Sequence, residues 1–191
     1  MVIVIATNNN GKLEEIKKIM DEYDIHSLND RNIDIDVIED QNTFLGNAKK
    51  KALEIYSISN EETIADDSGL CIDALDGFPG VMTHRFLGDL ATDEMRNEYL
   101  INELNKYPDR SAQVVCNLVY YDGSNVVVGE GILNGSISTE PRGTNGFGFD
   151  PIFELSNGLT LAELSVEEKN NVSARSLAAT DLKKKLKLLR R

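Results

Sequence analysis

The sequence predicts an α/β fold with a mixed sheet, and three observations support this class. Short apolar or alternating segments, typical of strands, interleave with segments whose apolar residues recur at helical spacing. Residues 111–121 and 126–133 are strand-like and are joined by Asp122-Gly123-Ser124-Asn125, which predicts a hairpin and hence at least one antiparallel pair. At 191 residues, without repeats, low-complexity tracts or a linker, the chain is expected to form one domain, residues 1–191.

The first half of the chain opens strand–loop–helix. The apolar run 2–6 is typical of a buried strand, and residues 8–11 form a turn. The following helix is indicated by apolar residues at helical spacing, namely Leu13, Ile16, Ile19 and Met20. Alternating apolar and acidic residues over 31–39 predict a half-exposed strand. Residues 47–57 then predict a helix with one apolar face.

The second half contains three further predicted helices. Residues 93–104 predict a long helix with Thr92 as its N-cap, and Ser165-Val166-Glu167-Glu168 is a capping-box pattern that opens a short helix. The final helix begins at about Ser173, and its predicted buried seam consists of Leu182, Leu186 and Leu189. A glycine-rich loop is expected over 143–150.

Charge and composition exclude several classes of protein. The formal charge of −12, from 32 acidic and 20 basic residues, argues against a broad surface for a nucleic-acid polymer but allows a small anionic ligand. The basic run 183–191 ends a predicted helix, where the helix dipole favours cations. No apolar stretch is long enough to span a membrane, and no secretory signal is seen. Cys71 and Cys116 are interpreted as reduced core thiols of a cytoplasmic protein.

Two adjacent carboxylates, Asp66 and Asp67, are the most informative feature of the chain. They lie between the apolar run 63–65 and the alternating stretch 70–75, so we expect a turn at a strand end that presents them to a ligand. Two carboxylates are poor core material, but they suit a Mg²⁺ ion bound between them and a phosphate. The alternative is an ordinary surface Asp-Asp-Ser-Gly turn.

A second candidate is the loop between the first predicted strand and helix. A helix N-terminus with free N–H groups, a glycine, a hydroxyl and a lysine can bind phosphate. The loop is not a Walker A motif, since it lacks the leading glycine and the Ser or Thr after lysine. Its lysine could equally be a surface residue. The candidate residues are Thr7, Asn8, Asn9, Asn10, Gly11 and Lys12.

Three more groups complete the list of candidates. Glu39, beside Asp40, could join the two aspartates at a metal, or could belong to an acidic loop. The loop 143–150 offers glycines that permit close backbone approach and two phenylalanines for stacking on a base, or it is a flexible turn. Lys169 and Arg175 could neutralise a polyphosphate or bind a purine carbonyl, or they are ordinary helix-surface cations. Carboxylates that can bind a metal, cations that can bind phosphate, and a loop of glycines and aromatic residues that can line a base together indicate a nucleotide-binding site.

The order and wording of these motifs resemble the inosine triphosphatase family, the pyrophosphatases of non-canonical purine nucleoside triphosphates. The matching segments span nearly the whole chain in the family's order. They are Ala6-Thr7-Asn8 to Lys12, Thr43-Phe44 with Asn47-Ala48-Lys49, Ala65-Asp66-Asp67-Ser68-Gly69-Leu70, Asp73-Ala74-Leu75, Gly77-Phe78-Pro79-Gly80-Val81, Gly146-Phe147-Gly148-Phe149-Asp150-Pro151-Ile152-Phe153, Ala162-Glu163-Leu164 and Glu167-Glu168-Lys169.

The resemblance implies a single nucleotide pyrophosphatase domain with an elongated mixed sheet, flanked by helices, in two lobes with a central cleft. It implies Mg²⁺-dependent hydrolysis of ITP, dITP or XTP to the monophosphate and pyrophosphate, which cleanses the nucleotide pool, and usually a homodimer. Glu39 and Asp67, with Asp66 as a further candidate, would bind Mg²⁺. Asp67 would also be the base for the attacking water, although Asp66 remains an alternative. Thr7 to Lys12 would hold the phosphates and Ser68 would contact substrate. The base and phosphate pocket would be lined by Phe147, Gly148, Phe149, Asp150, Lys169 and Arg175.

Two departures from the family pattern concern histidine. Ala174 stands where the family usually has His, and His84 stands in Thr83-His84-Arg85-Phe86, where the family often has Ser-Ala-Arg. We hypothesise that His84 lies in the same pocket and replaces the missing imidazole; the alternative is two unrelated substitutions. Two other functions also stay open: a pyrophosphatase for other modified nucleotides, and a non-catalytic nucleotide sensor.

Overall fold

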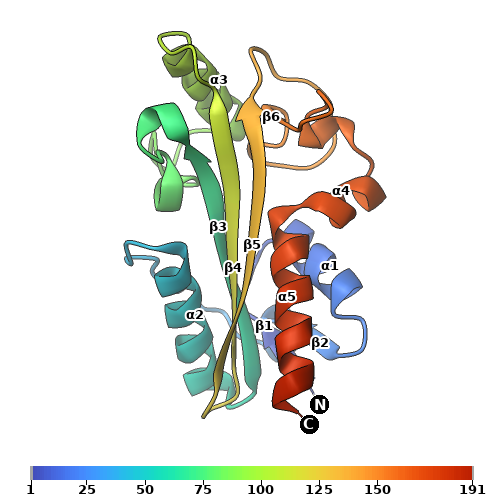
Figure 1. Ribbon diagram of the computed structural model, residues 1–191. Helices are drawn as coiled ribbons and strands as arrows, with labels where there is room; N and C mark the ends of the chain where they lie inside the picture. The colour runs from blue at the N-terminus through green and yellow to red at the C-terminus, as the bar shows by residue number, and fades with distance from the viewer. Residues whose placement is uncertain (1, 191) are drawn as a thin grey trace. The chain divides into compact units, whose positions relative to one another are not determined.

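The protein is described here by a computed structural model, which covers residues 2–190. This part of the chain contains a six-stranded sheet and five α-helices (Figure 1). The strands are β1 (Val2–Ile5), β2 (Asp24–Ser27), β3 (Glu62–Ile72), β4 (Ser111–Tyr121), β5 (Val126–Ile137) and β6 (Phe153–Glu154). The helices are α1 (Asn10–Ile19), α2 (Phe44–Ser59), α3 (Asp93–Leu104), α4 (Val166–Val172) and α5 (Ala174–Leu189).

The sheet is mixed, which confirms the predicted α/β class. Its strands are hydrogen-bonded in the order β2-β1-β3-β4-β5-β6. Strand β1 pairs in parallel with β2 and β3, whereas β5 and β6 are antiparallel. The predicted hairpin is also present, because β4 and β5 are neighbours and Asp122 accepts hydrogen bonds from the backbone of Ser124 and Asn125 in the turn.

The chain divides into two compact units. Unit 1 consists of Met1–Ser68, Cys116–Gly131 and Ala174–Arg191, and unit 2 of Gly69–Val115 and Ile132–Ser173. Each of the long strands β3, β4 and β5 contributes residues to both units.

In unit 1, α2 packs on one face of the sheet and forms an apolar core there. Thr43 caps the start of α2 by accepting a hydrogen bond from Gly46 N–H. The small residues of α2 allow close packing against one residue each from β1, β3 and β4. This cluster includes Ala48, Ala52 and Ile55 of α2 with Val4, Ala65 and Val119 of the strands.

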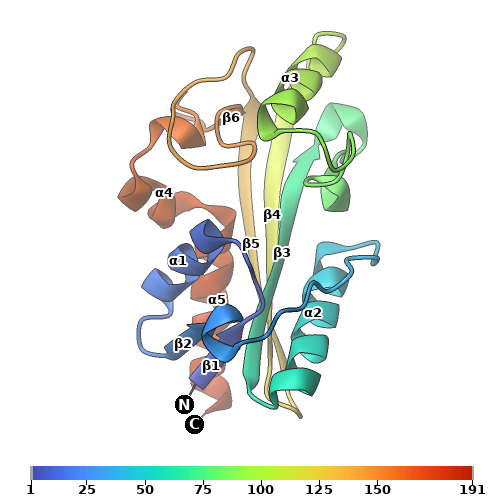
Figure 2. The same ribbon diagram turned by 180° about the vertical axis from the view of Figure 1, so that it is seen from behind.

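Helices α1 and α5 lie side by side on the opposite face of unit 1 (Figures 1 and 2). Two glycines of β5 allow α5 to approach the strand closely. A Cβ at Gly131 would lie 2.0 Å from the carbonyl oxygen of Ala174, and one at Gly129 would lie 2.3 Å from that of Ala178. Because these two positions have no side chain, the first turns of α5 can pack directly against β5.

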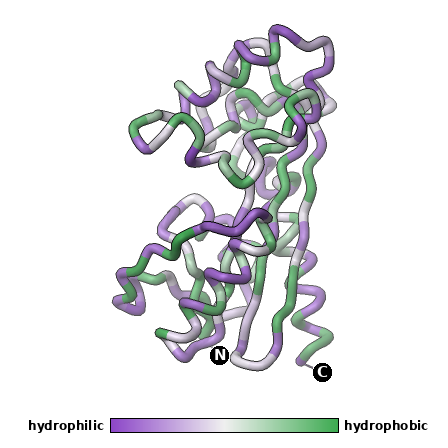
Figure 3. The backbone as a smooth tube through the Cα atoms, turned by 90° about the vertical axis from the view of Figure 1, so that its left-hand side faces the viewer, coloured by the Kyte–Doolittle hydropathy of each residue, from purple (hydrophilic) through white to green (hydrophobic). Residues whose placement is uncertain are grey.

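Polar and apolar residues alternate along α5, the last helix of the chain (Figure 3). Leu182 and Leu186 are fully buried, as predicted, but Leu189 is 42% exposed, because the helix ends there and has less of the sheet to pack against. Basic residues of this helix form ion pairs within unit 1, including Lys183 with Asp21 and Lys187 with Glu22. The basic run is thus largely neutralised within the protein.

Unit 2 confirms the predicted helix 93–104 and the short helix predicted to open at the capping box 165–168. Thr92 caps α3, and Ser165 with Glu168 forms the capping box of α4. The glycine-rich loop 143–150 has no regular structure, and its backbone is tied down by hydrogen bonds from Thr144 and Asn145 to the carbonyl oxygen of Ala162.

The predicted strand at residues 31–39 is wrong. A 3-10 turn at Asn29–Arg31 is followed by irregular backbone over 33–41, and the strand in this region is the earlier segment β2. Alternation alone was misleading here: Val37 is buried against α2, whereas Ile35 and Ile38 are exposed.

Both cysteines are free thiols. Cys116 is fully buried, as predicted, whereas Cys71 is only partly buried and is therefore not a core thiol. Within residues 2–190, no helix has the length and apolarity needed to cross a membrane.

We predict that Gly131→Ala lowers the free energy of unfolding by about 2 kcal/mol or more, because the added methyl must push the first turn of α5 away from β5. Chemical denaturation measures this change. Asn134→Ala, at an exposed position of the same strand, is the matched control and should shift the free energy by less than about 0.5 kcal/mol. Equal stability of Gly131→Ala and the native protein would contradict the close packing.

Candidate active site

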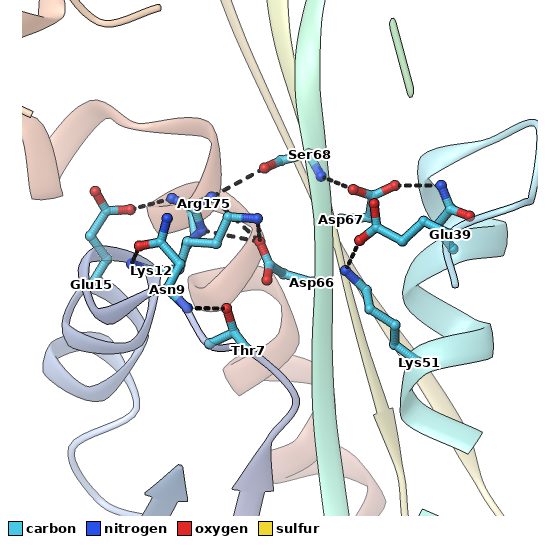
Figure 4. A network of polar contacts seen from close by, with 11 residues as sticks. Thr7, Asn9, Lys12, Glu15, Glu39, Lys51, Asp66, Asp67, Ser68 and Arg175 are labelled. Atoms are coloured by element: carbon cyan, nitrogen blue, oxygen red, sulfur yellow. Dashed lines mark hydrogen bonds and ion pairs between the residues drawn. The ribbon is translucent and has the colours of Figure 1, made fainter. Parts of the chain in front are cut away.

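The two adjacent aspartates lie within a continuous strand, not in a turn. Strand β3 runs unbroken from Glu62 to Ile72, so the predicted turn at a strand end is wrong. Successive side chains of a strand point to opposite faces. Asp66 therefore points toward α1 and α5, whereas Asp67 points toward α2 (Figure 4). Asp66 is bound by cations on its face, whereas Asp67 accepts hydrogen bonds from the Asn47 amide and from the N–H of Ser68.

The aspartates nevertheless lie in the sheet just beyond the point where the neighbouring strand β1 ends. The pairing of β1 with β3 ends at Ile5–Ile64, and the N–H of Ala6 donates to the carbonyl oxygen of Ile64. Asp66 follows two residues later. In α/β sheets, ligands bind beyond the carboxyl ends of parallel strands, and the end of β1 is such a place.

On the α1 and α5 face, Asp66 is bound by two cations. Lys12 Nζ lies 3.1 Å from Asp66 Oδ2, and Arg175 Nε and Nη2 both lie 3.4 Å from the same oxygen. Arg175 also donates to Ser68 Oγ at 3.1 Å and to Glu15 Oε2 at 2.7 Å. These residues are at most 9% exposed, so little water reaches the ion network.

The ionisable groups Asp66 and Arg175 on this face are held in their charged forms. Burial opposes ionisation of Asp66, but Lys12, Arg175 and Lys51 outweigh it and hold the pKa of Asp66 well below its usual range. Burial likewise opposes the charge of Arg175, yet Asp66 leads the neighbouring groups that raise its pKa. Asp66 Oδ1 is buried without a hydrogen-bond partner. Such an oxygen is costly in an inert core and is typical of functional sites.

The predicted phosphate loop caps α1 next to this network. Asn9 is the N-cap, and its Oδ1 accepts a hydrogen bond from Lys12 N–H, while Thr7 Oγ1 accepts one from Asn9 N–H. Asn8 is exposed in the loop, and Asn10 and Gly11 are the first two residues of the helix. The first amides of a helix have no partner within it, so this end suits an anion. The structure thus brings Thr7, Asn9 and Lys12 together with Asp66, Ser68 and Arg175.

On the α2 face, Asp67 is held by an amide and lies near a lysine and a second carboxylate. Asn47 Nδ2 donates to Asp67 Oδ2 at 2.9 Å, and the N–H of Ser68 donates to Asp67 Oδ1 at 2.9 Å. Lys51 Nζ donates to Glu39 Oε1 at 2.6 Å. Figure 4 shows Glu39, Lys51 and Asp67 converging from the loop before α2, from α2 and from β3.

The pKa of Asp67 is shifted opposite to that of Asp66. Burial raises the pKa of Asp67 to about 6, and the nearby charge of Glu39 adds to this, while Lys51 and the Asn47 hydrogen bond oppose it. Burial lowers the pKa of Lys51, but Asp66, Glu39 and Asp67 raise it above its usual value. Two neighbouring carboxylates, one of them costly to ionise, need another positive charge nearby.

The donor set on the α2 face fits a hard divalent cation. Glu39 and Asp67 supply carboxylate oxygens on the same face, as Mg²⁺ prefers, and one or two protein carboxylates are usual when substrate phosphates and water complete its shell. Among the described residues, no group of three His, Cys, Asp or Glu side chains is arranged to hold a metal. Asp66 does not join Glu39 and Asp67, because it faces the opposite side of β3.

Three of the candidate base-binding residues of unit 2 are held together by polar contacts. Asp150 Oδ2 accepts hydrogen bonds from Lys169 Nζ at 2.6 Å and from Phe147 N–H at 2.7 Å, and the Lys169 ammonium lies 4.4 Å from the centre of the Phe147 ring. Gly146 has a φ of +79°, and a Cβ there would collide with Asp150. The glycine is thus required for the loop to wrap around the carboxylate.

His84 lines a small pocket in unit 2 together with Gly148 and Phe149. Helix α3 holds the loop there, since Asn97 Nδ2 donates to Gly148 O and Gly148 N–H donates to Asp93 Oδ2. His84 therefore lies beside part of the predicted base-binding loop. Ala174, where the family usually has His, is buried at the start of α5 in unit 1.

Three residues of the network were missed as candidates from the sequence. Lys51 follows Asn47 by four positions on α2, and Glu15 follows Lys12 by three on α1. Such spacings place side chains on one helix face, so this signal could have found Lys51, Asn47 and Glu15. Their individual roles were hidden because the partners of Asn47 and Glu15 lie on β3 and α5, far away in sequence, and the partner of Lys51 lies in an irregular loop.

Comparison with known proteins finds similarity along nearly the whole chain. The Ham1 family model matches residues 3–185. A Clostridium tetani protein named dITP/XTP pyrophosphatase is 38% identical over 97% of this chain and 96% of its own, and a Geobacter sulfurreducens protein of the same name is 44% identical over 95% and 94%. The structure of the Staphylococcus aureus Ham1 protein superposes with a TM-score of 0.90 at 37% identity, covering 99% of this chain and all of that one.

We predict that Asp67→Asn stabilises the metal-free protein by about 2 kcal/mol at pH 7, because a carboxyl with a pKa raised to about 6 is costly to ionise on folding. The cost is present above pH 6 and vanishes below the ordinary aspartate pKa of about 3.9. Thermal unfolding in EDTA at pH 4 and pH 7 tests this: the gain in Tm should be larger at pH 7. A variant less stable than the native protein at pH 7 would contradict it.

Proposed function

Since the chain belongs to the Ham1 family, we propose that it hydrolyses non-canonical purine nucleoside triphosphates (ITP, dITP and XTP) to the monophosphate and pyrophosphate, using Mg²⁺. One observation carries this proposal. Just beyond the end of β1, strand β3 presents Asp66 with the cations Lys12 and Arg175 on one face and Asp67 near Glu39 on the other. The names of the relatives support the same reaction. Its expected role is to cleanse the nucleotide pool.

The part of the triphosphate that leaves as pyrophosphate is assigned to the α1 and α5 face of unit 1, and the α-phosphate is assigned to the place beside Asp67, the proposed base. Lys12 supplies a point charge, and Arg175 supplies a planar donor group suited to phosphate oxygens. The N-terminal amides of α1 and the polar side chains of the loop from Thr7 to Gly11 add donors. Ser68, whose Oγ lies 3.1 Å from Arg175 Nη2, is proposed to contact the substrate.

Mg²⁺ is assigned to Glu39 and Asp67. When bound, the ion neutralises charge on the phosphates and polarises their oxygens. Asn47 and the N–H of Ser68 orient the Asp67 carboxylate, and Lys51 orients Glu39. Asp66 is proposed instead as the residue that holds Lys12 and Arg175 in place, because both cations bind its Oδ2.

Asp67 is the proposed general base. A water held by its carboxylate gives up a proton to it as the oxygen attacks the α-phosphorus, and the α–β bridging oxygen leaves with its electron pair as part of pyrophosphate. Base catalysis of this kind contributes about 10²–10⁴ in rate. Asp67 is preferred over Asp66 for this role, since the pKa of Asp66 is held low and its Oδ2 is occupied by cations.

The purine base is assigned to unit 2. The Phe147 and Phe149 rings offer stacking surfaces, and Lys169, held by Asp150, can donate a hydrogen bond to a six-oxo group. His84 lines the pocket beside Phe149 and is proposed as an additional donor. A site built for a six-oxo group disfavours the amino group of adenine because a buried partner is then left unmet.

A homodimer in the cytoplasm is also proposed. Unit 2 exposes four large apolar side chains within residues 82–95, as interfaces do: Met82, Leu87, Leu90 and Met95. The two free thiols suit a reducing compartment.

We predict that pyrophosphate release from ITP and XTP with Mg²⁺ exceeds release from ATP. One unmet buried hydrogen bond costs about 1–3 kcal/mol, which corresponds to roughly 5- to 150-fold. Release is measured for ITP, dITP, XTP, GTP, ATP and dUTP, with Mg²⁺ and with EDTA. EDTA should abolish it. Pyrophosphate release only from other modified nucleotides would favour a pyrophosphatase specific for those nucleotides. Binding of ITP without pyrophosphate release would favour a non-catalytic nucleotide sensor.

We predict that Asp67→Asn and Glu39→Gln each lower turnover of ITP by a factor of about 10² or more while leaving the fold intact. Asp67→Asn removes the base and a metal ligand, whereas Glu39→Gln removes a metal ligand only. Asp40→Asn, an exposed neighbour of Glu39, is the matched control and should keep native turnover. Near-native activity of Asp67→Asn would overturn its assignment as the base.

A further inference from the structure

Helix α3 holds Gly148, the glycine between the two phenylalanines of the loop 143–150, by both of its backbone polar groups. Asn97 Nδ2 donates to the carbonyl oxygen of Gly148 at 2.9 Å, and the N–H of Gly148 donates to Asp93 Oδ2 at 3.0 Å. Asp93 and Asn97 are four residues apart on α3, so their side chains lie on one face of the helix. The two hydrogen bonds fix the peptide groups on both sides of Gly148.

Packing does little to hold the loop at Gly148. Its φ is +64°, in the left-handed region that glycine adopts most readily, and a Cβ built there would have no atom outside the neighbouring residues within 4 Å. Asn97, in contrast, is only 5% exposed. A buried amide of a helix therefore supplies the order that packing does not supply at this glycine.

The turn of α3 that carries these two side chains is itself anchored. Arg96 donates to the carbonyl oxygens of Phe86, Gly88 and Ala91 at distances of 2.7–3.0 Å, and it is 9% exposed. The start of the helix is thus tied to the segment that precedes it. Gly148 is therefore held by a fixed support.

The hydrogen bonds of residues 147–150 leave an unequal set of backbone groups. All four carbonyl oxygens already accept a hydrogen bond, that of Gly148 from Asn97 and the other three from backbone N–H groups. Three of the four N–H groups donate, whereas the N–H of Phe149 has no hydrogen-bond partner within residues 2–190. The backbone of this segment therefore offers a donor to a ligand, while its acceptors are occupied.

This set of groups matches one class of purine. A six-oxo purine has a hydrogen-bond acceptor at position 6, whereas adenine has an amino group there, which is a donor. The hydrogen bonds from α3 lie where the loop borders a cavity, since the small pocket beside His84 is also lined by Asp93, Asn97, Gly148 and Phe149. A carbonyl that already accepts a hydrogen bond serves an amino group less well than a free one.

We propose that Asn97 is a specificity-determining residue that favours six-oxo purines over adenine, because it engages the Gly148 carbonyl and, with Asp93, holds the loop. Both residues of α3 act through the loop and are positioning residues. The proposal rests on the proposed function for the identity of the ligand. Its structural content, the order that α3 gives to residues 147–149, does not depend on turnover.

Calorimetric titration with ITP and with ATP in EDTA tests the proposal without turnover. Asn97→Leu keeps the approximate size of the side chain but removes the amide donor, which releases the Gly148 carbonyl. The native protein should bind ITP more tightly, and the ratio of the ATP Kd to the ITP Kd should fall by about tenfold in this variant. Asn97→Ala, a second variant in case the leucine disturbs folding, should lower the ratio by a similar factor. Asn102→Leu, the same change at an exposed position of α3, is the matched control and should keep the native ratio.

Hydrogen exchange of the Gly148 amide measures the order of the loop directly. Asp93→Ala removes the acceptor of this amide, whereas Asp93→Asn removes the same charge but keeps an oxygen that can accept. Exchange should become faster by about tenfold or more in Asp93→Ala and in Asn97→Leu, and should stay within about threefold of the native rate in Asp93→Asn. Native exchange in Asp93→Ala and Asn97→Leu would show that α3 does not order the loop and would overturn the proposal.

The kinetic readout separates selection of the base from a general loss of structure. With Mg²⁺, KM for ITP should rise by about threefold or more in Asn97→Leu while kcat stays within about twofold, because Asp67 and Glu39 are unchanged. A structural defect lowers kcat for every nucleotide. An unchanged Kd ratio in either Asn97 variant with a native circular dichroism spectrum overturns the proposal, as does a native protein that binds ITP no more tightly than ATP. If the ratio falls as expected but no nucleotide releases pyrophosphate with Mg²⁺, the proposal stands and the proposed hydrolysis fails.

Discussion

The burial of two adjacent carboxylates is the constraint on which the rest of this structure depends. A dry aspartate needs compensating charge or hydrogen bonds, and two on one face would repel each other. In strand β3, Asp66 and Asp67 point to opposite faces, and each has its own partners there. The cations for Asp66 come from α1 and α5, and the amide for Asp67 comes from α2. The helices of unit 1 are therefore tied to β3 by charge as well as by apolar packing.

The packing of unit 1 places those partners. Small residues of α2 let it lie close to the sheet, which brings Asn47 and Lys51 to Asp67 and Glu39. Gly129 and Gly131 do the same for α5, whose second residue is Arg175. The parallel pairing of β1 with β3 ends just before the aspartates, and α1 begins there with its N-terminus and Lys12. One region of the sheet thus gathers groups from four segments that are distant in sequence.

Several features of this region oppose folding. The pKa of Asp67 is raised, Asp66 Oδ1 has no hydrogen-bond partner, and Arg175 sits at the positive end of a helix. Groups that lower stability in this way are not expected in a core that serves only packing. Their presence is typical of a site whose groups are arranged for binding and chemistry at some expense of stability. The same features distinguish the two proposed roles, in which Asp66 organises cations and Asp67 binds a metal and takes a proton.

Local patterns in the sequence determined most of the elements. Spacing of apolar residues, the caps Thr92 and Ser165 and the hairpin turn at 122–125 were sufficient for α1, α3, α4 and the β4–β5 pair, since these signals act over a few residues. The motifs also determined the family, because matching segments occur in the family's order over nearly the whole chain. Only the tertiary structure decided that β3 continues through both aspartates, that Asp66 is separated from Glu39, and that Glu15 and Lys51 complete the network. Strand continuity, face and ion pairing depend on partners such as Lys12 and Arg175, more than 50 and 100 residues from Asp66, and no local pattern specifies which charges will meet.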